Sequence, residues 1–202
     1  MRRATLVRMI DDFAKAYLHE DLRWARRSIL TKMEGLSEYD RRRPLTRTGT
    51  NLLGLIKHLT LSEARYLGDV VGRPFPEREP RFEGPHFANR DSLWVTEQTS
   101  YADVIDGYER ACRHADATID ALPIDAAGHV PWWPQPDVKL FNVMVHVLNE
   151  TNRHAGHADI LREQIDGAVG AGMTSTSALD EADWAAHRSR VEEAARAAGS
   201  IN

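Results

Sequence analysis

Four segments of this chain carry apolar residues at the three-and-four spacing of helices that face a core. They cover approximately residues 17–36, 50–71, 99–122 and 139–165, and residues 5–16 form either a separate short helix or the start of the first one. Gly35, Gly72, Pro123 and Gly167 stand at or near their ends, where helices commonly stop. No long strand pattern separates them, although short strand pairs within residues 75–95 stay open. The sequence therefore predicts an all-α four-helix bundle with long crossovers.

The remaining segments are interpreted by composition. Residues 72–99 contain four prolines and the aromatic residues Phe75, Phe82, Phe87 and Trp94. We expect a long connection between the second and third helices, and its aromatic residues favour an ordered one. Either Thr48 or Thr50 is expected to cap the second helix. A linker after residue 167 leads to an amphipathic helix over residues 181–198, with Trp184 on its apolar side. The expected division is a bundle at 1–167 and a linker with a C-terminal helix at 168–202.

Composition excludes several classes of protein. The net charge is -4 and no basic block is present, which argues against nucleic acid or an anionic membrane as the main partner. No apolar run approaches the length of a membrane span. The single cysteine, Cys112, permits no internal disulfide and is expected in the core of the third helix. These features predict a cytoplasmic protein.

The stretch 146–159 concentrates the residues that carry chemistry. His146, Glu150 and His154 are spaced four apart, so they lie in a row on one face of the fourth predicted helix. Apolar residues continue that face on both sides: Val143, Val147, Ala158, Leu161 and Ile165. A carboxylate and imidazoles on a core-facing stripe are costly to bury unless something pairs them. A divalent metal ion would pair them.

A third ligand has to come from a facing helix. The second predicted helix contains one histidine, His58, next to its apolar stripe. Two imidazoles and one carboxylate form a known zinc site that keeps a position open. The alternative to a metal site is that Glu150 and His154 form a surface ion pair and that His58 is a core histidine with its hydrogen bonds satisfied.

Other polar residues lie in or beside this stretch. His146 and His157 border the same face and are candidates to hold the ligand imidazoles, although either could equally be a surface histidine. Arg153 points to another helical face and receives no catalytic role. Asp159 and Arg162 are spaced for an ion pair within the helix.

Several motifs together resemble the DinB/YfiT-like superfamily of metalloenzymes. The segment GLIKHL (54–59) with Ser62 and Glu63 resembles its second-helix signature, and ETNRHAGHADILRE (150–163) resembles its fourth. The segments MEGL (33–36) and WWP (132–134) are similar to those of its actinobacterial branch. The resemblance covers residues 22–163 and implies an up-down-down-up four-helix bundle with an additional C-terminal helix. It also implies metal ligation by His58, Glu150 and His154, with the carboxylate as in the mycothiol-dependent maleylpyruvate isomerase branch.

Three functions compete on this basis. The first is a divalent-metal-dependent S-transferase with an open site of two histidines and a glutamate. It would use a low-molecular-weight thiol, mycothiol by resemblance, as cosubstrate with a small-molecule substrate. Zinc is the expected ion, with nickel and iron as alternatives. The second is a metal-dependent hydrolase, in which the ion activates water. The third is a non-enzymatic metal-binding stress-response protein, a homodimer whose site is closed by His146 or His157.

Overall fold

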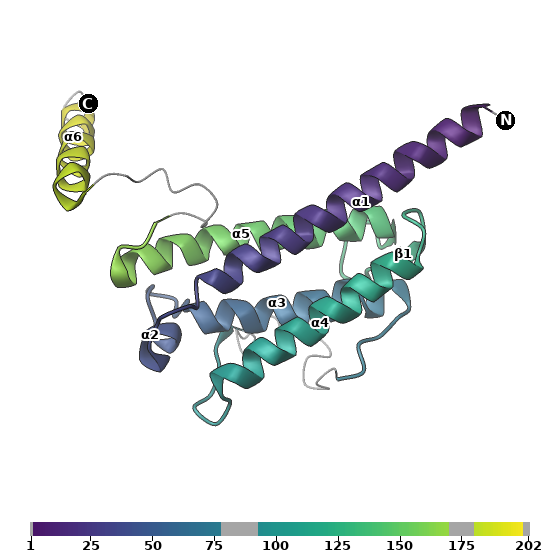
Figure 1. The fold of residues 1–202 in the computed structure, drawn as a ribbon, viewed down its shortest axis with the longest axis horizontal. Coiled ribbons are helices and arrows are strands. Elements are labelled where there is room, and N and C mark those ends of the chain that lie inside the picture. Colours follow the sequence, from purple (N-terminus) through teal and green to yellow (C-terminus); the bar gives the residue numbers. More distant parts are fainter. Residues whose placement is uncertain (1, 78–92, 170–179, 200–202) are drawn as a thin grey trace.

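The computed structural model describes residues 2–77, 93–169 and 180–199. Four long helices form a bundle, as Figure 1 shows: α1 (Arg2–Thr31), α3 (Leu52–Tyr66), α4 (Tyr101–Ala121) and α5 (Leu140–Asp166). The shorter elements are helix α2 (Glu38–Arg42), the 3-10 helix η1 (Asp69–Val71) and a hairpin of strands β1 (Ala127–His129) and β2 (Asp137–Lys139). Helix α6 (Glu181–Gly199) follows the bundle. The predicted all-α bundle with an additional C-terminal helix is confirmed.

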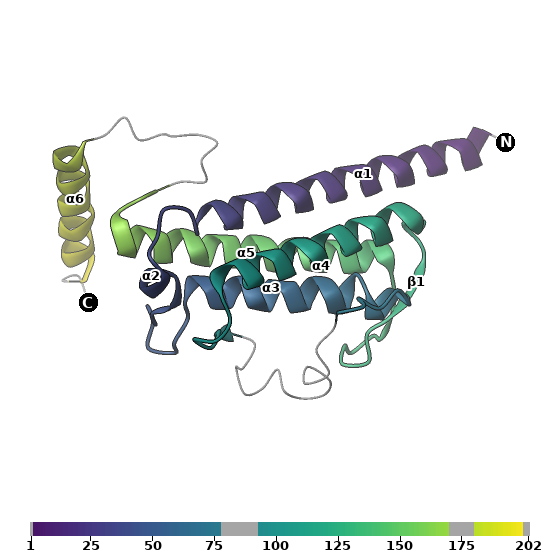
Figure 2. The ribbon, with the colours of Figure 1, turned by 60° about the horizontal axis from the view of Figure 1, so that its bottom comes forward.

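The relative directions of the four long helices follow from which helix ends pack into the same buried cluster. One buried cluster joins the end of α1, the starts of α3 and α4 and the end of α5, as represented by Ile29, Leu55, Val104 and Ala158. A second cluster joins the middle of α1, the residues after α3, the end of α4 and the start of α5, as represented by Leu22, Leu67, Ile119 and Val143. Helices α3 and α4 therefore run parallel to each other and antiparallel to α1 and α5. This is the expected up-down-down-up order, and Figure 2 shows the same arrangement.

The predicted helix ends are partly wrong, for local reasons. The cap of α3 is Asn51, whose side chain accepts a hydrogen bond from the Gly54 amide at 2.8 Å, and neither Thr48 nor Thr50 takes this role. Helix α3 ends at Tyr66, and the turn η1 carries the chain to Gly72, which has the left-handed φ of 74°.

Helices α4 and α5 begin and end close to their predicted positions, whereas α1 ends at Thr31 and not near the predicted end at residue 36. Helix α4 starts with a capping box between Ser100 and Asp103. Helix α5 ends at Asp166, and Gly167 caps it with the left-handed φ of 75°. Helix α1 is one continuous helix, so residues 5–16 are its first half and not a separate element.

The strands lie where no strand was predicted. Val138 pairs with Gly128 across a hairpin that presents Trp132 and Trp133 in its connection. Three-residue strands are too short to show an alternating pattern in the sequence. The described part of residues 75–95 contains no strand, whereas Phe82, Phe87 and the rest of 78–92 lie outside the described residues, as does the predicted linker at 170–179.

The C-terminal helix differs from the bundle helices in its burial. None of the described residues of α6 is buried, and Trp184 is 40% exposed. The division at residue 167 therefore stays a prediction. Across the described ranges, no helix combines the length and apolar character that crossing a membrane requires.

A buried ion network ties three helices together. The guanidinium of Arg26 on α1 donates two hydrogen bonds to the Glu63 carboxylate on α3, at 2.7 and 2.6 Å. It donates a third to Asp116 on α4, at 2.6 Å. Asp116 also lies 2.8 Å from His19 Nε2 and accepts a bond from Arg23 at 2.9 Å. The Glu63 side chain is fully buried and that of Arg26 is 5% exposed, so each charge depends on the other for compensation.

This network predicts a large stability effect for Glu63→Ala. The substitution leaves the Arg26 guanidinium buried without its main partner, which is expected to lower the free energy of unfolding by about 3–5 kcal/mol. Urea denaturation of both proteins would measure the loss. The matched control is Glu109→Ala on α4, which removes an exposed pair with Arg113 and should change stability by less than about 0.5 kcal/mol. A loss for Glu63→Ala as small as that of the control would contradict the prediction.

Candidate metal centre

The antiparallel packing of α3 against α5 brings the three predicted ligands together. His58 Nε2 lies 3.3 Å from Glu150 Oε1, and His154 Nε2 lies 3.1 Å from the same oxygen. One donor atom from each of the three residues lies within 4.8 Å of the other two. The two imidazole rings meet edge to face, with centroids 4.8 Å apart. The site thus joins an i, i+4 pair from one helix to a single histidine of the facing helix.

Apolar neighbours place the three side chains at the helix interface. Leu55 and Leu59 are buried on either side of His58 along α3, and Val147 and Ala158 are buried on either side of the pair on α5. The polar side chains stay at the edge of this core. They are 12% exposed for His58, 23% for Glu150 and 11% for His154. The site is therefore partly shielded but still reached by solvent.

Burial sets the protonation of the site. It lowers the pKa of His58, and together with His58 it lowers the pKa of His154 to about 4. Burial alone would raise the pKa of Glu150, but His154 and His58 outweigh it and hold that pKa below its usual value. At neutral pH the imidazoles are neutral and the carboxylate is ionised. Histidine and glutamate bind a cation in this state.

The geometry fits a divalent ion. Ligands at about 2.1 Å from a tetrahedral zinc ion are about 3.4 Å apart. The separations of 3.3 and 3.1 Å between Glu150 Oε1 and the two imidazole nitrogens are close to that value. Two imidazoles and one carboxylate are also a ligand set that zinc accepts. The donor atoms of all three residues lie within 4.8 Å of one another, so this cluster could bind a metal ion.

The two remaining histidines of the motif have different surroundings. His157 Nδ1 lies 3.3 Å from His154 Nδ1, on the ring edge opposite the nitrogen that faces Glu150. His157 thus contacts a candidate ligand from behind, as the hypothesis of a supporting role requires. His146 lies instead among aromatic rings, with centroids 4.3 Å from Tyr66 and 4.9 Å from Trp133. Burial lowers the pKa of His146 as well.

An aromatic group lies one helical turn along α5 from the centre, around His146. Trp132 donates its indole N–H to the Tyr66 hydroxyl at 3.1 Å, and the Arg65 guanidinium lies 3.6 Å from the centroid of the Trp132 ring. With Trp133 and His146, these residues form what we call the aromatic wall: Tyr66, Trp132, Trp133 and His146. Tyr66 joins this wall because α3 ends there, and the hairpin connection supplies the two tryptophans.

Two predicted details need correction. Asp159 and Arg162 do not pair with each other, because Asp159 lies 2.6 Å from Lys32 Nζ and Arg162 pairs with Asp166. Arg162 also donates to the carbonyls of Lys32 and Glu34, which fastens the end of α5 to the end of α1. Arg153 does approach the centre, since its Nε lies 4.0 Å from Glu150 Oε2.

Cys112 is partly buried against the first core cluster and takes no part in the candidate centre. Burial raises the pKa of its thiol, so the group stays protonated at neutral pH. This agrees with the expectation of a core residue and not a nucleophile.

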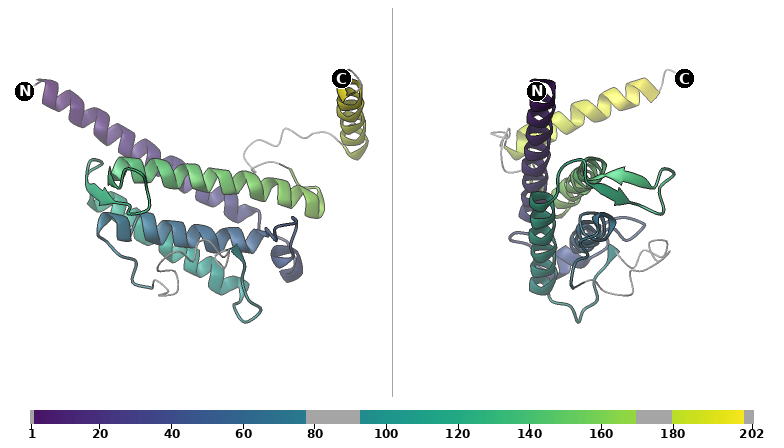
Figure 3. Two further views of the ribbon diagram at one scale, coloured as in Figure 1. Left: turned by 180° about the vertical axis from the view of Figure 1, so that it is seen from behind. Right: turned by 90° about the vertical axis from the view of Figure 1, so that its right-hand side faces the viewer.

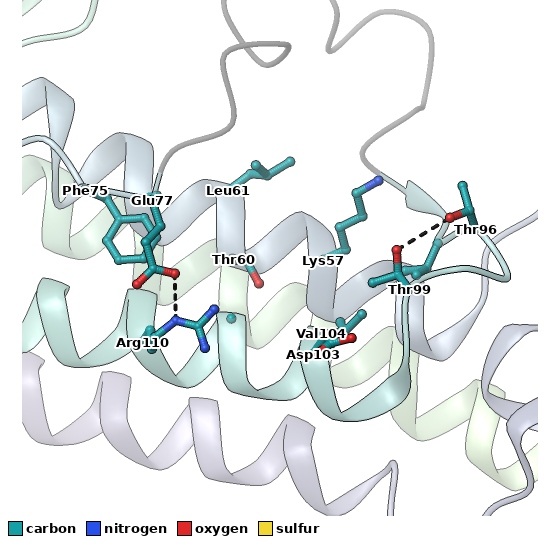
Figure 4. Close-up of a pocket in the computed structure, with 13 residues that line it drawn as sticks. Lys57, Thr60, Leu61, Phe75, Glu77, Thr96, Thr99, Asp103, Val104 and Arg110 are labelled. Atoms are coloured by element: carbon teal, nitrogen blue, oxygen red, sulfur yellow. Dashed lines mark hydrogen bonds and ion pairs between the residues drawn. The ribbon is translucent and has the colours of Figure 1, made fainter.

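A separate cavity of about 320 Å³ lies between α3 and α4. Figure 4 shows the paired Glu77 and Arg110 towards one end and Lys57, Thr96 and Thr99 towards the other. None of the three candidate ligands lines it. Helix α3 therefore presents one face to this cavity and another, with His58, to α5.

The fold and the centre together define a class: a DinB-like helical bundle with a candidate site for a divalent metal ion. Comparison with protein families gives a match to the family described as Mycothiol-S-transferase over residues 17–167. The match spans the bundle from the second half of α1 to the end of α5 and covers most of the chain, so this chain belongs to the mycothiol S-transferase family, and the DinB-like assignment is confirmed. Among curated proteins, no significant match was found.

We expect His58→Ala to lose the metal but not the fold. Removing one of three ligands should weaken zinc binding by at least about 100-fold, since even groups that only support a ligand contribute up to that factor. The apolar core should keep the bundle helical without the ion. Zinc content after dialysis and far-ultraviolet circular dichroism measure the two effects.

The control for this variant is His129→Ala, in the exposed hairpin, which should keep its zinc. Unchanged zinc in His58→Ala would remove His58 from the site. Loss of helicity together with the metal would identify a structural ion instead.

Proposed function

We propose that this protein is a divalent-metal-dependent thiol S-transferase that uses mycothiol, with His58, Glu150 and His154 as the metal ligands. The observation that carries the proposal is the meeting of three donors at metal-ligand spacing in a member of the mycothiol S-transferase family. Zinc is the proposed ion, because two imidazoles and a carboxylate are a set that it accepts.

The reaction requires a thiolate, because the thiolate and not the thiol is the nucleophile. A divalent ion in the site supplies the positive charge that favours the ionised form of a bound thiol at neutral pH. The thiol proton leaves to solvent, the sulfur forms a bond to the electrophilic carbon, and the leaving group departs with the electron pair of the bond that breaks. The neutral imidazoles and the single carboxylate leave a net positive charge on a divalent ion, which this step needs.

An open coordination position is the second requirement, and the geometry supports it. His157 contacts His154 on the far edge of the ring, so it is placed to orient that imidazole and not to reach the same ion. His146 packs into the aromatic wall. Within the described residues, the candidate metal cluster comprises three residues. These positions argue against a closed, purely binding site.

The aromatic wall is proposed as the surface that receives the body of the thiol. Tyr66 and Trp132 present partly exposed rings and Arg65 adds a positive charge beside them. Flat aromatic faces bury the apolar faces of ring-shaped ligands, while the hydroxyl and indole groups offer hydrogen bonds at the edge. One turn of α5 separates His146 in this wall from Glu150 in the centre.

A transferase should consume mycothiol in the presence of an electrophile such as 1-chloro-2,4-dinitrobenzene, and Glu150→Ala should lower kcat/KM by at least about 100-fold, the scale of losing one charge-stabilising group. Glu163→Ala, on the exposed surface of the same helix, is the matched control and should retain activity. Conjugate formation followed by chromatography measures both. Hydrolysis of an activated ester at an equal rate with and without thiol would favour the hydrolase instead.

A further inference from the structure

The cavity of about 320 Å³ between α3 and α4 lies on a different face of α3 from His58. Figure 3 shows α3 between α4 and α5, so these two neighbours contact different sides of it. Residues at three-and-four spacing line the cavity along both helices, among them Thr60 and Ala64 on α3 and Val104 and Gly107 on α4. A cavity of about 150 Å³ holds benzene, and small-molecule sites begin at about 300 Å³. This cavity therefore has room for a molecule of about two rings.

Gly107 gives the cavity part of its volume. It lies inside α4, where a glycine weakens a helix relative to alanine. Apart from the backbone of its own helix, a Cβ atom at this position would come within 4 Å only of the Arg110 guanidinium, at 3.9 Å. Packing among the described residues therefore does not require a glycine here, and the missing side chain leaves space that a ligand can occupy.

One wall of the cavity is apolar and aromatic. Phe75 is 9% exposed and packs with Ala64 and Ala111 in a small buried cluster, apart from the two main ones. Leu61 continues this wall along α3. A buried aromatic side chain favours a flat, apolar ligand that can stack on its ring or meet it edge to face.

The ionised groups that line the cavity are already bound to neighbours. Arg110 donates to Glu77 at 2.7 Å, as Figure 4 shows, and Lys57 Nζ donates to the carbonyl of Trp94 at 3.0 Å. The Asp103 carboxylate accepts the hydrogen bonds of the capping box at the start of α4. An ionised ligand would lose its hydration without meeting an uncompensated opposite charge, so the lining favours an uncharged ligand.

The end of the cavity away from the Glu77–Arg110 pair offers two hydroxyl groups. Thr96 Oγ1 and Thr99 Oγ1 lie 3.5 Å apart, which is long for a bond between two hydroxyls. Arg42 on α2 fixes this segment, because it donates to the backbone carbonyls of both threonines at 3.0 and 2.8 Å. A ligand hydroxyl between the two side chains can donate to one and accept from the other.

We propose that this cavity binds an uncharged, flat aromatic molecule of about two rings that carries one hydroxyl group, a ligand of the naphthol class. Its rings lie against Phe75 and over Gly107, and its hydroxyl bonds with Thr96 and Thr99. His58 belongs to another face of α3, so this binding does not depend on the metal centre or on thiol transfer.

Titration of the full-length protein with 2-naphthol, followed by amide nuclear magnetic resonance, tests the site. This phenol is uncharged at pH 7 and should bind with a Kd of about 1 mM or tighter, shifting the amide signals of Thr60, Thr99 and Gly107. The matched ligand 2-naphthoate has the same rings but carries a carboxylate, and should bind at least about 10-fold more weakly. Equal binding of 2-naphthoate, no saturable shift at these residues, or shifts confined to the aromatic wall would overturn the proposal.

Filling the cavity should prevent binding without unfolding the protein. Gly107→Leu places a side chain in the free space and removes a helix-weakening glycine. The melting temperature should therefore stay the same or rise, while the Kd for 2-naphthol weakens by at least about 10-fold. The matched control Ala117→Leu changes an exposed position of the same helix and should bind 2-naphthol as the wild type does.

A second variant tests the hydroxyl contacts separately. Thr99→Val keeps the cavity volume but removes one hydroxyl, and should weaken 2-naphthol binding by about 5-fold. Wild-type affinity in Gly107→Leu, or an unchanged Kd in Thr99→Val, would contradict the proposed site.

Discussion

The bidentate pair between Arg26 and Glu63 is the interaction on which the arrangement of the bundle depends. Its two charges are buried between α1 and α3, and the third bond of Arg26 to Asp116 adds α4. Ionised groups at such depth tolerate little displacement, because a shift of one turn would leave a charge without compensation. The pair therefore fixes the register of α3, the helix that carries His58 five residues before Glu63.

With α3 held in place, the position of α5 completes the centre. Glu150 and His154 occupy successive turns of one helix face, and the antiparallel approach of α3 sets His58 against the same carboxylate oxygen. The buried network uses one side of α3 and the candidate metal centre uses another. The bundle thus separates residues that hold the helices together from residues that are available to a ligand, and a substitution in one set need not damage the other.

The sequence could predict that His58, Glu150 and His154 meet, because the information for this contact is largely local. An i, i+4 pair and a single histidine in the facing helix leave little freedom once four helices are assigned. The Arg26–Glu63 pair could not be predicted in this way, because it joins residues 37 positions apart that no local pattern connects. The aromatic wall depends on a hairpin with three-residue strands, too short to recognise. Likewise, the cap at Asn51 competed with two nearby threonines that are equally plausible by residue type.

The most direct test of the account is whether a thiol binds at the centre formed by His58, Glu150 and His154. Cobalt in place of zinc makes this visible, since thiolate coordination produces a sulfur-to-metal charge-transfer band in the near ultraviolet. The account predicts that mycothiol produces this band in the cobalt-loaded protein, more readily as the pH rises and the thiol ionises, and that His154→Ala abolishes it. If cobalt is bound by these residues but mycothiol does not change the cobalt spectrum at any pH, this result would contradict the thiol-transfer function.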